Sequence, residues 1–74
     1  MINKVEIERI KSTYHAGMRV RLLRMDDIQA PPVGIEGTVL GVDDIGSVAV
    51  KWDDGSRLNV VLDEDEIEFV PKED

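Results

Sequence analysis

Residues 34–56 read GIEGTVLGVDDIGSVAVKWDDGS, and this stretch indicates the fold more clearly than any other part of the chain. It contains short runs in which valine, leucine or tryptophan alternates with other residues, and glycines and the turn segments DDIG and DDG separate these runs. Alternation with a period of two indicates half-buried strands, and Asp-Gly pairs favour tight hairpin turns. The stretch therefore predicts strands over residues 35–42 and 47–52, joined by a turn at residues 43–46.

Two details refine these strands. Val39 and Val42 are three positions apart, so both can face the core only if a β-bulge lies near Gly41. Trp52 has the inward phase of its strand, so we expect it to pack in the core. A role as a ligand platform is the alternative, but aromatic cages need several rings, and the chain has one Trp, one Tyr and one Phe.

The same period continues on both sides of this stretch. We expect further strands over residues 18–23, 57–61 and 67–70, and an acidic turn over residues 63–66. Between the first two strands lies a long loop at residues 25–33, which its proline pair stiffens. Five short antiparallel strands predict a mainly β fold, an SH3-like barrel, whose closure leaves few exposed edges.

The N-terminal residues have a helical pattern instead. Over residues 3–14, Asn3 can cap the helix at its start, with Glu6 at capping-box spacing. One narrow apolar stripe follows at helical spacing, and Gly17 is suited to a left-handed C-terminal position. We therefore divide the chain into a helical leader at residues 1–16 and a single barrel domain at residues 17–71.

Size and composition limit the class of protein. Seventy-four residues make one small domain, and the absence of cysteine excludes disulfides and a Cys-ligated zinc. No continuous hydrophobic run occurs, so we expect a soluble cytoplasmic protein without a membrane anchor. The net charge is −7, although residues 1–24 hold six basic and two acidic side chains. This overall acidity opposes non-specific binding to nucleic acid.

Three pairs of aspartates are candidate metal ligands: Asp26-Asp27, Asp43-Asp44 and Asp53-Asp54. Each pair stands beside a predicted turn, where Asp side chains commonly accept backbone N–H bonds, and no calcium-loop spacing occurs. We therefore predict turn capping and no metal or cofactor site. The sequence also lacks a nucleophile motif or an acid–base pair, so we expect no enzyme activity and no catalytic residues.

Two groups of residues are candidates for contact with a partner. Arg19 and Arg21 share one face of the first strand, and Arg24 lies at its end; together they can bind phosphates or pair with nearby acids, among them Asp26, Asp27 and Glu68. The second group consists of residues that we expect to be at least partly exposed. Its members beside the long loop are Ile28, Pro31, Pro32 and Leu40, and others are Leu23, Ile45 and Val61.

Four segments carry a family resemblance. GMRVRLLRMDD, APPVGIEGTV, VDDIG and VKWDDGS begin at residues 17, 30, 42 and 50, and they resemble domain of unknown function 4314. This is a short domain of bacterial genomes, often near mobile elements, and it has no established activity. The resemblance covers residues 14–70 and implies the barrel fold. The spacing of glycine and valine in the first two segments is also similar to the KOW pattern of nucleic-acid-binding barrels. The run VKWDDG is similar to strands of the mind-bomb and Tudor-like barrels, which bind proteins.

Two main functions remain open from the sequence, and a third reading is a regulatory ligand sensor with an acidic ion site, which a melting shift on adding calcium or magnesium would support. The first is a non-enzymatic protein-binding module that docks another protein, or itself, through an apolar strip beside the loop. The second is a KOW-like module that contacts nucleic acid through its basic first strand. No small-molecule substrate and no membrane partner is indicated.

Overall fold

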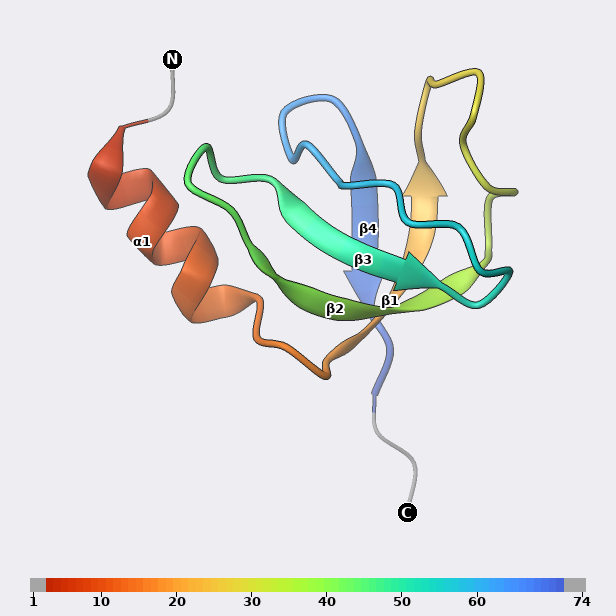
Figure 1. The fold of residues 1–74 in the computed structure, drawn as a ribbon, viewed down its shortest axis with the longest axis horizontal. Coiled ribbons are helices and arrows are strands. Elements are labelled where there is room, and N and C mark those ends of the chain that lie inside the picture. The colour runs from red at the N-terminus through yellow and green to blue at the C-terminus, as the bar shows by residue number, and fades with distance from the viewer. Residues whose placement is uncertain (1–2, 72–74) are drawn as a thin grey trace.

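The computed structural model describes residues 3–71 and contains one helix and a four-stranded antiparallel sheet (Figure 1). The helix α1 spans Lys4–Thr13, and the strands are β1 Arg19–Arg24, β2 Glu36–Val42, β3 Val48–Trp52 and β4 Glu66–Phe69. The strand order in the sheet is β3-β2-β1-β4. The predicted mainly β architecture with a short N-terminal helix is confirmed. Residues 1–2 of the predicted leader lie outside the described residues.

The start of α1 is capped as predicted, whereas its end is not. The Asn3 side chain accepts a hydrogen bond from the Glu6 N–H at 2.9 Å. Tyr14 is the C-terminal cap, and its N–H donates to the Ile10 carbonyl. Gly17 does have a positive φ of 94°, but it lies beyond the cap and its N–H donates to the Val39 carbonyl at 2.7 Å. Gly17 therefore joins the leader to the sheet instead of closing the helix.

The core lies on the inner face of the sheet. Alternate residues of β1 and β3 point inward, because successive side chains of a strand face opposite sides. Trp52 is 1% exposed, which confirms it as a core residue. Its indole N–H donates to the Leu58 carbonyl at 3.1 Å, so the buried ring leaves no unpaired donor. The fully buried apolar residues are Val20, Leu22, Val39, Val48, Val50, Trp52 and Val60.

The predicted bulge and the predicted turn are both present. The pairing of β2 with β3 shifts between Val39 and Gly41, so that Val39 faces Val50 and Val42 faces Val48. The shift lets both valines contact the core, with Val39 fully buried and Val42 half-buried. In the following turn Gly46 has a φ of 85°, a conformation that few other residues adopt without strain.

Gly37 on β2 is required for close packing rather than for a turn. It lies directly opposite Trp52 in the β2–β3 pairing. A Cβ at this position would lie 2.7 Å from Val50 Cγ1 and 2.8 Å from Trp52 Cε3. Both distances are shorter than any ordinary carbon–carbon contact, so a glycine is needed for β3 to approach this closely.

The predicted strand at residues 57–61 is not formed. Within residues 3–71 this segment contributes an isolated bridge, in which Val60 and Val48 exchange backbone hydrogen bonds of 2.8 and 2.9 Å. The inward phase of the segment is confirmed, because Val60 is buried and Leu58 is half-buried. The Leu58 carbonyl, however, accepts a hydrogen bond from the Trp52 indole N–H. In a regular strand, this carbonyl would accept a backbone N–H of the neighbouring strand instead.

The helix α1 is short and carries charged residues. No helix in residues 3–71 is long and apolar enough to cross a membrane.

Candidate interaction surface

The outer face of the sheet carries a network of ion pairs centred on Arg19. The register places Arg19 opposite Thr38, and the β3 strand ends beside Asp53. The guanidinium donates to both Asp53 carboxylate oxygens, at 2.6 and 2.9 Å, and to Thr38 Oγ1 at 2.9 Å. Glu36 lies 3.5 Å away on the other side. This fork-to-carboxylate geometry uses most of the donors of Arg19.

The other two arginines are also paired. Arg21 lies between Glu36 and Glu68, with N–O distances of 3.5 and 3.6 Å, because the register places it opposite both. Arg24 contacts Asp26 at 3.1 Å. The predicted pairing with Asp26 and Glu68 is therefore confirmed. Arg19 and Arg21 share one face and both contact Glu36, whereas Arg24 is separated from that network.

Hydrogen bonds shift the pKa values of several charged groups on this surface. The bond from Arg19 lowers the pKa of Asp53 below its ordinary value, and the same bond raises the pKa of Arg19. Bonds from the side chain and backbone of Ser56 likewise lower the pKa of Asp54. These groups therefore stay ionised at neutral pH, and the network carries both signs of charge.

In each of the three aspartate pairs, one residue caps a turn and its neighbour forms an ion pair with a basic side chain. In each pair one carboxylate accepts a turn N–H, which confirms the turn-capping prediction. The neighbouring carboxylate approaches a cation instead. Residues 3–71 contain no group of three or more side chains that could hold a metal ion. The capping residues are Asp27, Asp43 and Asp54, and the cation-paired residues are Asp26, Asp44 and Asp53.

The loop between β1 and β2 exposes apolar side chains although its backbone is ordered by hydrogen bonds. This loop is the yellow segment that projects at the upper right of Figure 1. The side chain of Ile28 is fully exposed, at 101%, and Val33 is 69% exposed. The Ala30 N–H donates to the Asp27 carbonyl at 2.9 Å. Pro31 is buried and Pro32 is exposed, so of this predicted pair Pro32 is the one on the surface.

Leu40 does not join the loop. It is 48% exposed and lies on β2 at the bulge, towards the end of the strand that leads to the turn at residues 43–46. The loop precedes the opposite end of β2, so the structure separates Leu40 from Ile28. The predicted exposure of Leu23, Ile45 and Val61 is confirmed, at 41%, 71% and 39%.

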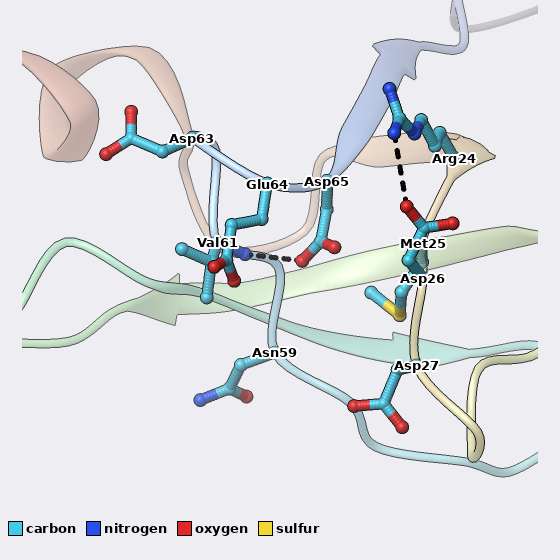
Figure 2. A pocket seen from close by; sticks show the side chains of 9 residues that line it. All are labelled: Arg24, Met25, Asp26, Asp27, Asn59, Val61, Asp63, Glu64 and Asp65. Carbon is cyan, nitrogen blue, oxygen red and sulfur yellow. Dashed lines mark hydrogen bonds and ion pairs between the residues drawn. The ribbon is translucent and has the colours of Figure 1, made fainter.

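An acidic hollow of about 450 Å³ lies beside the loop (Figure 2). Its carboxylates come from two segments that are distant in sequence, the loop after β1 and the turn before β4. Arg24 is the cation in its lining, and Asp65 accepts the Val61 N–H at 2.9 Å. The hollow has no local sequence signal, because only the pairing of β1 with β4 brings the two segments together. Its acidic lining residues are Asp26, Asp27, Asp63, Glu64 and Asp65.

Comparison with known proteins places the chain in a family. No match was found among curated proteins. The model of the family described as Domain of unknown function (DUF4314) matches residues 3–70, which is nearly the whole chain. The match agrees with the four segments that first indicated this relationship and extends it to the helix. The protein belongs to the DUF4314 family.

Proposed function

We propose that this domain is a non-enzymatic protein-interaction module that docks another protein through the loop between β1 and β2. The observation that carries the proposal is the complete exposure of Ile28 on a loop whose backbone is hydrogen-bonded. A fully exposed isoleucine contributes nothing to the core, whereas burial against a partner stabilises a complex by about 1.5–3 kcal/mol before ordering costs.

The surroundings of Ile28 indicate the chemistry of its partner. The exposed side chains of Pro32 and Val33 add apolar surface on the same loop. The acidic hollow adjoins the loop, and its lining holds five carboxylates and one guanidinium. A complementary surface therefore has an apolar pocket for Ile28 and basic side chains at its rim, which also speed the encounter.

We infer that the sheet closes on itself to form an SH3-like barrel. Val60 pairs with the outer edge of β3, and the chain then continues into β4, which pairs with β1 at the opposite side of the sheet. One segment thus runs from one edge of the sheet to the other around the core. Such a closed scaffold would hold the loop in a fixed position.

Contact with nucleic acid through Arg19, Arg21 and Arg24 has less support. Each guanidinium already lies within 3.6 Å of at least one carboxylate. A phosphate would have to compete with these neighbours, and the net charge of −7 opposes its approach. Salt-sensitive binding of RNA or DNA that is lost on changing the three arginines to glutamine would favour this alternative.

The proposal is tested by comparing two isoleucine substitutions in quantitative affinity capture from the native host. Ile28→Ser removes the exposed loop side chain, and Ile45→Ser makes the same change in a hairpin turn, where the side chain is also largely exposed. We expect one or more proteins to bind the wild type and Ile45→Ser equally and Ile28→Ser at least about tenfold less.

Sedimentation velocity provides the second measurement. Concentration-dependent dimers that Ile28→Ser abolishes would identify a second copy as the partner. Equal capture by all three proteins, with no effect of Ile28→Ser on self-association, would refute docking through the loop. Circular dichroism melting of each variant verifies that the fold is retained.

A further inference from the structure

We infer that the outer edge of β4 accepts an added strand from another polypeptide, an extended segment in which basic and apolar side chains alternate. This surface is separate from the loop of the proposed function and does not depend on it. Strand addition to a sheet edge is a general mode of peptide recognition, in which backbone hydrogen bonds provide affinity and alternate side chains provide specificity.

The backbone of β4 has an unpaired side. The Val70 N–H donates to the Arg19 carbonyl at 3.0 Å, and Arg21 lies opposite Glu68. Backbone groups of successive strand residues point to opposite sides, so those of Glu68 point to β1, whereas those of Ile67 and Phe69 point away from the sheet. Within residues 3–71 no hydrogen bond is made to these outward N–H and C=O groups. They are available to a further strand.

The inner side of this edge presents apolar surface. Phe69 lies opposite the buried Val20, so its side chain is on the inner side of β4, yet it is 45% exposed. The ring of Tyr14 stacks on it with centroids 5.2 Å apart and so covers one of its faces. A mostly apolar hollow of about 480 Å³ adjoins Phe69 on the side of β1, where Met18 and Arg19 also line it, so the apolar surface at the free edge is that of Phe69 itself. An inward side chain of an added strand can therefore contact apolar atoms here.

The outer side of the same edge is acidic. Glu66 and Glu68 alternate with Ile67 and Phe69, so their carboxylates lie on the outer face of the sheet, with Glu66 exposed. The Glu68 carboxylate contacts Arg21 on one side only, at 3.6 Å. Opposite charges on neighbouring strands stabilise a pairing, so basic side chains fit the outer positions of an added strand.

A second copy of this chain is a poor occupant. In an antiparallel pairing of β4 with itself that sets Ile67 opposite Ile67, Glu66 stands opposite Glu68 of the second copy. If Ile67 is set opposite Phe69, the two copies of Glu68 face each other. Like charges in directly opposite positions destabilise a strand pair, and each copy carries a net charge of −7.

Three capped hexapeptides test the proposal with the wild-type protein. KVKVKF alternates basic and apolar residues, KKKVVF has the same composition without alternation, and EVEVEF has the opposite charge. Amide hydrogen exchange measured by NMR is the readout. We expect KVKVKF to slow exchange at the Ile67 and Phe69 N–H by about tenfold or more, with Glu68 protected in every sample because its N–H faces β1. KKKVVF and EVEVEF should leave both rates unchanged.

Paired variants separate backbone from side-chain effects. Phe69→Ala removes the ring and keeps the outward N–H, whereas Phe69→Pro removes both, and proline is tolerated at an outward edge position. We expect weaker binding of KVKVKF by the alanine variant and none by the proline variant, with Ile28→Ser binding as the wild type does. The inference is overturned if KVKVKF leaves the Ile67 and Phe69 rates unchanged, if KKKVVF protects them equally, or if Ile28→Ser abolishes the protection.

Discussion

The two faces of the sheet are built by the same strands and differ in almost every other respect. On the inner face, Val20 and Leu22 of β1 are fully buried. Between and beside them on β1, Arg19 and Arg21 point outward, and more than a third of each side chain remains exposed. Burial of apolar area is the larger source of stability, whereas exposed ion pairs contribute little. Stability therefore depends on the inner face, whereas the charged groups of the outer face mainly pair with one another.

The largest expected effect comes from the centre of the inner face. Trp52→Ala should lower the free energy of unfolding by about 3–5 kcal/mol, because it leaves a cavity and an unpaired Leu58 carbonyl. Chemical denaturation followed by circular dichroism measures the change. Lys51→Ala, which alters the neighbouring exposed position of β3, is the control and should change little. A stable Trp52→Ala protein would mean that the inner face does not hold the fold.

A smaller loss is expected where two strands approach closely. Gly37→Ala should cost about 1–3 kcal/mol, since the added Cβ would lie within 3 Å of the Val50 and Trp52 side chains. The same substitution in a Val50→Ala background should cost less, because the shortest of three close contacts is removed, while those with the Trp52 ring and the Lys51 carbonyl remain. A double-mutant cycle measures this coupling. Equal costs in both backgrounds would show that β2 shifts away from β3 instead.

The smallest effect is expected on the outer face. Asp53→Asn should lower the melting temperature by less than about 5 °C at pH 7. The bond from Arg19 lowers the pKa of Asp53 in the folded state. Its stabilising contribution is therefore complete above the unfolded pKa of about 3.9 and is lost as the pH falls through the lower, folded value.

Melting curves recorded between pH 7 and pH 2 test this sign. The difference between wild type and Asp53→Asn should be constant near neutral pH and should shrink below about pH 4. Asp63→Asn is the charge-matched control, because Asp63 makes no ion pair within residues 3–71. A difference that grows on acidification would contradict the assigned role of the Arg19–Asp53 pair.

Local patterns predicted most of the fold. The strand phases, the bulge at Gly41 and the N-terminal cap at Asn3 each depend on residues a few positions apart, and all three are confirmed. The segment at residues 57–61 has the same alternation but forms only a bridge. The structure of this segment depends on the Trp52 indole, whose N–H donates a hydrogen bond to the Leu58 carbonyl. The alternation of residues in the sequence does not indicate such a contact.

The candidate surface was less accessible to sequence reasoning. The sequence predicts that the arginines pair with acids. It does not indicate Asp53 as the main partner of Arg19, because the order of the strands brings these two residues together. The acidic hollow and the open edge of β4 likewise arise from the order of the strands in the sheet. Long-range pairing decides which segments meet, and a single sequence does not encode that in any local pattern.

The bond from the Trp52 indole to the Leu58 carbonyl makes the protein its own optical reporter. The chain contains one tryptophan, so its intrinsic fluorescence comes from a single site in the core. If the segment at residues 57–61 lifts from β3, the indole meets water, and its emission shifts to longer wavelength while the rest of the sheet is still paired. Detachment of this segment can thus be distinguished from global unfolding without any label.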